Sequence, residues 1–277
     1  MADPAAERLA QRAPALQYLH DGDPSKASYH LVKAFKNVLA GITSPDEGAK
    51  RLESVVMSQG NRFWDTYETV IVHITNGASE LTSDIVLQRL AALTAALTRL
   101  PDAKNNGNET LTWKDNLGVQ GKAEPGVAII HNELSREDVC RQWSNVNAFL
   151  AHLTKHSRGH NDALDYYMYA ILTLRVTLEE GDTNGNNSSL ETRMHTPAAA
   201  QWIRIMGPEL HRGTKVFRAN DRHMVGGGML YNDHKYGYGF SPQRWALWRD
   251  RFWQFAGDMA LDGETREVAA DAAKAMR

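Results

Sequence analysis

The sequence predicts an all-α protein, a layered multi-helix bundle of about ten helices with long irregular loops. Helix start signals are the first observation: Ser44-Pro45-Asp46-Glu47 has the form of a capping box, and Thr196-Pro197 and Ser241-Pro242 repeat its cap-then-proline start. Apolar residues between these signals recur every three or four positions, as in a helix with one buried face. Alternation with a period of two, which is typical of strands, is missing between the turn signals.

In the first half of the chain the predicted helices span residues 4–19, 25–40, 45–58, 62–75 and 83–99. The first three end before Gly22, Gly41 and Gly60, because glycine adopts the left-handed conformation that often closes a helix. The fourth and fifth follow from apolar stripes, namely Phe63, Tyr67, Val70, Ile71 and Ile74, and then Leu87, Leu90, Leu93 and Leu97.

In the second half the predicted helices span residues 135–156, 161–179, 197–212, 242–256 and 264–276. The first three carry stripes made of Val139, Trp143, Val146, Leu150 and Leu153, of Leu164, Tyr167, Ile171, Leu174 and Leu178, and of Ala199, Trp202, Ile203, Met206 and Leu210. Each stripe is apolar on one side only, so the helices must pack on one another to bury it. No convincing linker interrupts the chain, and we predict one helical domain over residues 1–277.

Three connections are predicted to be long loops, at residues 101–134, 181–195 and 213–240. Long loops in a compact domain tend to be functional or disordered. The loop at 213–240 is rich in both glycine and aromatic residues, so we expect it to pack against the body of the protein. Its Gly226-Gly227-Gly228 run lacks the flanking strand and lysine of a phosphate-binding loop, and we interpret it as a turn.

Composition excludes several classes of partner. The 277 residues are 42% hydrophobic and 23% charged, with a formal net charge of −2, which does not favour nucleic acid or an anionic membrane as partner. Cys140 is the single cysteine, so no disulfide forms within the chain and a reducing compartment is expected. No apolar run is long enough for a membrane span, and the first residues lack the apolar region of a secretory signal. We therefore expect a cytoplasmic location.

Four tryptophan-centred segments carry a family resemblance. They are Phe63-Trp64-Asp65, Gln142-Trp143-Ser144-Asn145-Val146-Asn147-Ala148-Phe149, Ala198-Ala199-Ala200-Gln201-Trp202-Ile203, and Gly239-Phe240-Ser241-Pro242-Gln243-Arg244-Trp245 continuing to Trp248 and Phe252. In this order they resemble the fungal family catalogued as domain of unknown function 3632, and residues 264–276 are similar to its last helix. The chain departs from the family's pattern at 101–134 and 214–238, which run longer. The resemblance implies a fungal, helical, single-domain protein, often found beside small-molecule biosynthetic genes, and it supplies no catalytic residues.

His152, His156 and His160 are the one arrangement with metal-ligand spacing, because imidazoles one turn apart on a helix can share an ion. Gly159 is expected to break the helix before His160, and histidines near a helix C-terminus are favoured by the helix dipole. We therefore interpret the three as surface residues and expect no metal.

Asn147 and the tryptophans are the candidate site residues. Asn147 flanks the buried stripe of its helix, so its amide is either a link between helices or a ligand-orienting group, and the structural reading is favoured. Six tryptophans occupy core-like helical positions, and a pocket between helices is lined mainly by such aromatic side chains. They are Trp64, Trp143, Trp202, Trp245, Trp248 and Trp253.

Two functional hypotheses follow. The first is a cofactor-independent cyclase or isomerase of fungal secondary metabolism, including pericyclic reactions, acting on a largely apolar small molecule. Its predicted catalytic residues are Asn147 and Tyr167, and its predicted substrate-binding residues are Trp64, Tyr67, Trp143, Trp202 and Trp248. The second is a non-catalytic protein that binds a small molecule or a partner protein. Neither requires a metal or a cofactor, and the oligomeric state is left open.

Overall fold

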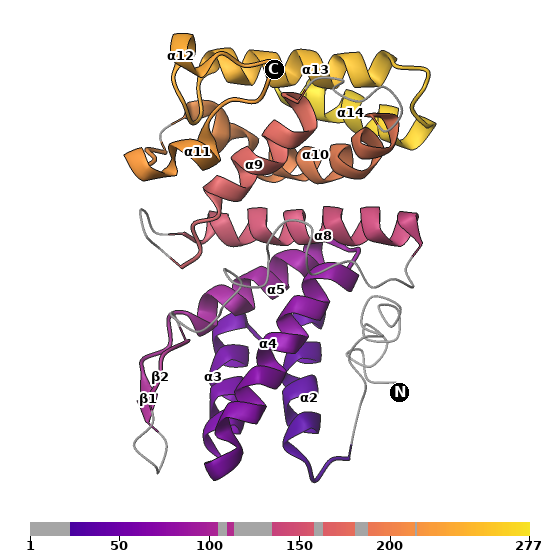
Figure 1. Ribbon diagram of the computed structural model, residues 1–277. Helices are drawn as coiled ribbons and strands as arrows, with labels where there is room; N and C mark the ends of the chain where they lie inside the picture. Colours follow the sequence, from indigo (N-terminus) through magenta and orange to yellow (C-terminus); the bar gives the residue numbers. More distant parts are fainter. Residues whose placement is uncertain (1–22, 105–109, 114–134, 158–162, 181–187, 214) are drawn as a thin grey trace. The chain divides into compact units, whose positions relative to one another are not determined.

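A computed structural model describes residues 23–104, 110–113, 135–157, 163–180, 188–213 and 215–277. These residues are mostly helical (Figure 1), which confirms the predicted all-α fold. The strands among them are the short β1 (Ala103–Lys104) and β2 (Thr110–Leu111), which pair antiparallel with Ala103 opposite Leu111. The predicted helix at 4–19 lies outside the described residues.

The described helices gather into two compact units. Unit 1 contains the described residues up to Trp113 together with 156–157 and 163–164, and unit 2 contains 135–155 and the described residues from Asp165 onward. The single domain predicted over 1–277 stays a prediction.

The described residues of unit 1 form four longer helices. They are α2 (Ala27–Ala40), α3 (Pro45–Met57), α4 (Phe63–Glu80) and α5 (Asp84–Leu97), with the 3-10 turn η2 (Gly60–Arg62) before α4. The predicted capping box is present, since the Ser44 hydroxyl accepts from the Glu47 backbone N–H and the Glu47 carboxylate accepts from the Ser44 N–H. Gly41 ends α2 with a φ of 74°, as expected for a glycine closing a helix.

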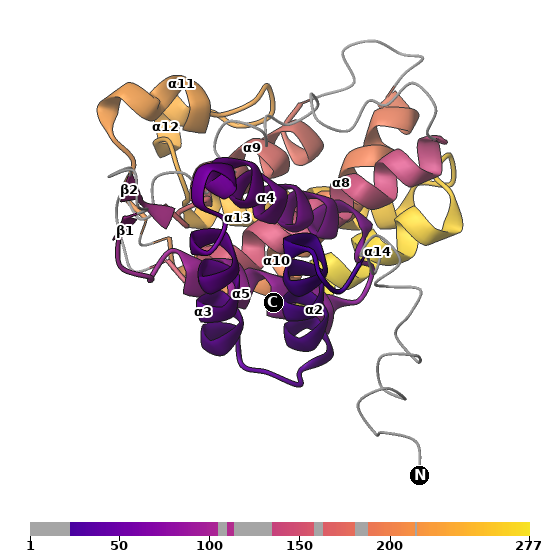
Figure 2. The same ribbon diagram turned by 90° about the horizontal axis from the view of Figure 1, so that it is seen from below.

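The helices of unit 1 pack closely at small residues. Helices α2, α3 and α4 lie side by side in both views (Figures 1 and 2), and α5 packs on all three. Gly48 of α3 faces Val38 of α2, where an added Cβ would lie 2.2 Å from Val38 Cγ2. The absence of a side chain at Gly48 is therefore what lets α2 and α3 approach.

In unit 2 the described residues form five longer helices and three short ones. The longer helices are α8 (Arg136–Lys155), α9 (Tyr167–Leu178), α10 (Ser188–Arg212), α13 (Pro242–Gly257) and α14 (Gly263–Ala275). The short elements are η3 (Ala219–Asp221), α11 (Arg222–Val225) and α12 (Asp233–Tyr236). Helix α10 contacts α8, α9 and α14, and α13 packs against α14 and α9. The predicted cap at Ser241-Pro242 is present, with the Ser241 hydroxyl accepting from the Arg244 N–H.

Two helix starts differ from prediction. Helix α10 begins at Ser188 instead of Pro197, so the Thr196-Pro197 cap is wrong and Pro197 lies inside the helix. An internal proline costs about 3 kcal/mol, and packing of α10 against three helices outweighs this local preference. The predicted loop at 181–195 is thus helical from Ser188. Helix α9 begins at Tyr167, later than the predicted residue 161.

The predicted loop at 213–240 packs on the body of unit 2, as expected. It contributes the buried side chains of Phe217, Val225 and Tyr231. Among the described helices, none combines the length and apolar character needed to cross a membrane.

Candidate functional site

The predicted site residues fall into both units. Trp64 and Tyr67 lie on α4 of unit 1, and the others lie on α8, α9, α10 and α13 of unit 2. Within unit 2 the structure joins Trp143 and Trp202 to Asn147, and it links Tyr167 to Trp248 through Phe240.

Asn147 is a buried hydrogen-bonding link between three helices. Its Oδ1 accepts from Trp202 Nε1 of α10 at 2.7 Å and from the Thr173 hydroxyl of α9 at 3.0 Å. Its Nδ2 donates to the Trp143 carbonyl one turn earlier on α8, at 2.9 Å. Both acceptor positions of Oδ1 are therefore occupied by protein donors, which leaves a ligand no acceptor at this oxygen.

Trp143 lies beside His195, with ring centroids 6.2 Å apart and ring planes at 90°. Burial lowers the pKa of His195, the Glu191 carboxylate opposing this, so the imidazole is neutral near pH 7. This places Trp143 in an apolar contact between α8 and α10.

Trp248 belongs to a fully buried ion-pair network. Glu179, at the end of α9, accepts from Trp248 Nε1 at 2.6 Å and from Arg244 Nε at 2.5 Å through Oε1. Its Oε2 accepts from Arg244 Nη2 at 3.0 Å and from the Gly228 N–H at 2.8 Å. Both side chains of the pair are 0% exposed.

Arg244 connects this pair to the 213–240 segment. Its remaining N–H groups donate to the carbonyls of Val225, Gly226 and Gly239 at 2.8–3.0 Å, so all five guanidinium donors are used. Glycine is required at position 228, because an added Cβ there would lie 2.8 Å from Glu179 Cβ. With every donor and acceptor paired, this network holds the segment in place and leaves no group for a substrate.

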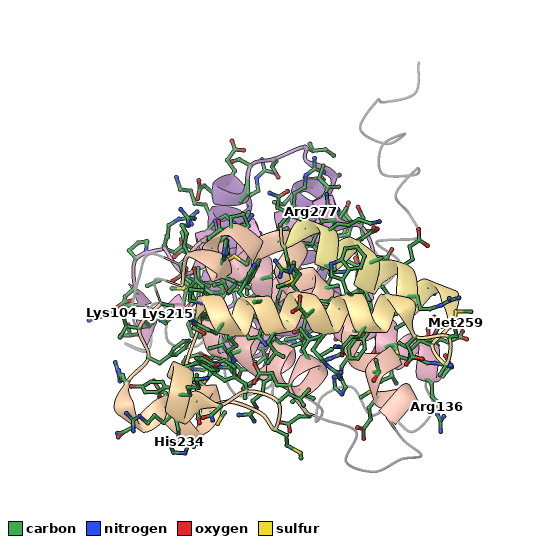
Figure 3. All side chains as sticks on the ribbon, turned by 90° about the horizontal axis from the view of Figure 1, so that it is seen from above. Lys104, Arg136, Lys215, His234, Met259 and Arg277 are labelled. Atoms are coloured by element: carbon green, nitrogen blue, oxygen red, sulfur yellow. The ribbon has the colours of Figure 1, made fainter. Side chains whose placement is uncertain are left out.

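A different cluster of unit 2 brings polar and aromatic side chains together, and we call it the Tyr167 site. It consists of the polar residues Asp165, Tyr167, Glu209 and Lys215 and the neighbouring rings of Phe217 and Phe240. Lys215 donates to Asp165 Oδ2, and both side chains are largely buried, at 14% and 11% exposed. The Lys215 ammonium also lies 5.7 Å from the centre of the Tyr167 ring and 5.9 Å from that of Phe217. Figure 3 places Lys215 near the end at which α13 begins.

Tyr167 is held in its neutral form. Burial raises the pKa of its phenol, and the nearby carboxylates of Glu209 and Asp165 raise it further, against the opposing charge of Arg212. The phenol is therefore a hydrogen-bond donor over the whole physiological pH range. Within the described part of the chain, Glu209 Oε2 is buried without a hydrogen-bond partner, so this carboxylate oxygen can still accept a hydrogen bond.

An apolar cluster borders these polar groups. Ile171, Phe217 and Val225 form its buried part, and partly buried side chains pack against it: Tyr167, Met168, Met224, Tyr238 and Phe240. The Tyr167 and Phe240 rings meet edge to face at 6.0 Å. Aromatic and methionine side chains beside a few converging polar groups are the composition typical of a small-molecule site.

Sequence reasoning found Tyr167 but missed its partners. Asp165 and Lys215 are separated by 50 residues, and no local spacing rule connects residues so far apart. No sequence pattern singled out Glu209. Trp113 was also missed, because it lies within the predicted loop at 101–134, yet it is 0% exposed. Conversely, Trp64 and Trp253 are 38% and 43% exposed, so the predicted core role is wrong for these two tryptophans.

The three histidines with metal-ligand spacing are described only in part. No group of three or more histidine, cysteine or acidic residues within the described ranges could hold an ion, and His160 lies outside them. His152 is only 7% exposed, so its assignment to the surface is wrong. Burial and the Asp262 carboxylate raise the pKa of Cys140, which disfavours a reactive thiolate.

Comparison with known proteins gives one match. The model of a family described as "Protein of unknown function (DUF3632)" matches residues 64–252, more than half of the chain, from the start of α4 into α13. No curated protein and no solved structure matches the chain.

Proposed function

The chain belongs to the DUF3632 family of proteins of unknown function, and we propose that unit 2 binds a largely apolar small molecule and converts it, without a cofactor, as an isomerase or cyclase. The family predicted from the tryptophan-centred motifs is confirmed over 64–252, whereas the similarity seen at 264–276 lies outside the match. A cytoplasmic role in fungal secondary metabolism is part of the proposal.

One observation supports this activity most directly. A neutral phenol and an ammonium–carboxylate pair meet at the first turn of α9, beside partly buried aromatic and methionine side chains. The Glu209 carboxylate, which has a buried oxygen without a partner among the described residues, is near enough to raise the pKa of the phenol. A donor, a cation and a base near an apolar surface are the groups needed to move a proton next to a carbonyl.

Three residues have separate roles in the proposed reaction. Tyr167 donates a hydrogen bond to the carbonyl oxygen of the substrate, and Glu209 removes a proton from the adjacent carbon. The negative charge that develops on the oxygen is stabilised by the Lys215 ammonium. Isomerisation follows when Glu209 returns the proton to a different carbon. Cyclisation follows when the enolate carbon attacks the carbon of a second carbonyl group in the same molecule. The oxygen of that second carbonyl group then takes the proton from Glu209.

The test begins with the substrate. Deleting the gene in its host and identifying the accumulating metabolite provides the compound, which is then incubated with purified protein in deuterium oxide. We expect a product of unchanged molecular composition, apart from deuterium incorporated next to the carbonyl. Tyr167→Phe and Glu209→Gln should each lower the rate about 100-fold or more, whereas the exposed controls Tyr236→Phe and Glu267→Gln should retain it.

Each contrary outcome has a definite meaning. A rate that depends on Tyr167 but not on Glu209, without deuterium uptake, would indicate a pericyclic reaction that needs only the donor. Binding of the accumulated metabolite without conversion would identify a non-catalytic binding protein. An unchanged metabolite profile in a strain that produces such compounds would contradict the proposal.

A further inference from the structure

Unit 1 contains two buried aromatic side chains in contact, each of which carries a hydrogen-bond donor. Tyr67 of α4 is 5% exposed and Trp113, just after β2, is 0% exposed. Their ring centroids lie 5.2 Å apart with the planes inclined at 56°. Within the residues that the structure describes, neither Tyr67 Oη nor Trp113 Nε1 has a hydrogen-bond partner.

Unpaired buried donors are uncommon in a folded core. The large majority of buried polar side-chain atoms are hydrogen-bonded, because an unpaired buried donor loses its water without compensation. An indole N–H can only donate, so Trp113 requires an acceptor from elsewhere. Burial raises the pKa of Tyr67, so its hydroxyl stays protonated and also offers a donor. Two donors on contacting rings are therefore without an acceptor among the described residues.

The surroundings define the chemistry of that acceptor. The Tyr67 ring contacts Trp64 edge to face at 5.8 Å as well as Trp113, and Trp64 in turn contacts Phe63 at 4.9 Å. An aromatic surrounding favours a neutral acceptor, since burying a charge without a partner is far more costly. Trp64 is 38% exposed and so brings the cluster to the surface of unit 1.

We infer that Tyr67 and Trp113 form a second small-molecule site, which binds an aromatic or otherwise apolar compound through one neutral carbonyl oxygen. The carbonyl accepts from Trp113 Nε1 and Tyr67 Oη, and the apolar part of the compound packs against Trp64. This site belongs to unit 1 and is independent of the Tyr167 site of unit 2 and of the function proposed for it.

The test follows the indole N–H signals of the full-length protein. The protein is labelled with ¹⁵N-tryptophan, and the signal of Trp113 is assigned among the seven tryptophans with Trp113→Phe. Acetophenone is the probe, and ethylbenzene, which has a similar shape but no acceptor, is its control. We expect acetophenone to move the Trp113 signal downfield in a saturable manner, and ethylbenzene to leave it in place.

Substitutions make the result specific. Tyr67→Phe should weaken acetophenone binding roughly fivefold through loss of one hydrogen bond, and Tyr29→Phe, a tyrosine elsewhere in unit 1, should leave it unchanged. Tyr167→Phe should also leave it unchanged, which separates this inference from the proposed function. If Trp113→Phe does not fold, acetophenone binding is still measured on the wild-type Trp113 signal in the Trp64→Leu and Tyr67→Phe variants. An unaffected Trp113 signal, equal shifts with both probes, or a water molecule bound to the indole N–H in the presence of acetophenone would overturn the inference.

Discussion

The Asn147 amide ties α8, α9 and α10 together through one oxygen atom. We expect Asn147→Ala to destabilise the protein by about 2–4 kcal/mol, because Trp202 Nε1 and the Thr173 hydroxyl both lose their acceptor in a buried place. Urea unfolding followed by circular dichroism measures the loss. Thr173→Val, which removes only one of the two donors, is the matched control and should cost about 1 kcal/mol.

The same substitution decides whether Asn147 is also catalytic. A variant that keeps its stability but loses turnover would show that the amide orients the substrate. A variant that loses stability while its folded fraction keeps its activity would assign Asn147 to structure. The saturated acceptor positions of its oxygen favour the second result.

Arg244 and Glu179 are also buried polar residues whose role is structural and not catalytic. A buried ion pair is a weak source of net stability, but removing either partner leaves a charge uncompensated. Here the pair is bonded to three carbonyls and one N–H of the 213–240 segment. Its role is thus to define where that segment lies, and through it the position of Phe217 and Phe240 in the Tyr167 site.

At the scale of helices, the crossing of α2 and α3 depends on Gly48. We expect Gly48→Ala to destabilise unit 1 by about 1–3 kcal/mol, since its methyl group overlaps Val38 Cγ2. Gly257→Ala at the end of α13 is the control: an added Cβ there meets nothing within 4 Å, so alanine should be neutral or stabilise by up to about 1 kcal/mol. Chemical denaturation of both variants gives the comparison.

A second substitution tests whether the overlap with Val38 causes the loss of stability. Val38→Ala removes the overlapping methyl groups, so the double variant should be less destabilised than the sum of the two single variants. Strict additivity would mean that the cost of Gly48→Ala arises elsewhere.

At the scale of the whole molecule, each unit has its own buried core. We therefore expect two unfolding transitions in calorimetry. Gly48→Ala should lower the temperature of one transition and Asn147→Ala that of the other, because the two residues lie in different units. A single transition that shifts with both substitutions would contradict this expectation and support the single domain predicted from the sequence.

Local signals explain which elements could be predicted. The helices at 25–40, 45–58, 83–99, 242–256 and 264–276 were placed within a few residues of their observed bounds. Caps, glycine stops and apolar periods each involve residues within two turns of one another, so they can be read along the chain. The start of helix α10 was predicted wrongly, because packing against its neighbours overrides the proline that marks a typical start.

By itself, the sequence determined the all-α class, most helix positions, the family and the aromatic candidates, because these depend on short-range order and residue type. The tertiary structure alone decided which polar groups meet: Lys215 with Asp165, Arg244 with Glu179, and Tyr67 with Trp113. These partners are separated by about 45 to 65 residues, and the way helices pack brings them together. Chemistry at a site depends on distances through space, which neighbours along the chain do not reveal.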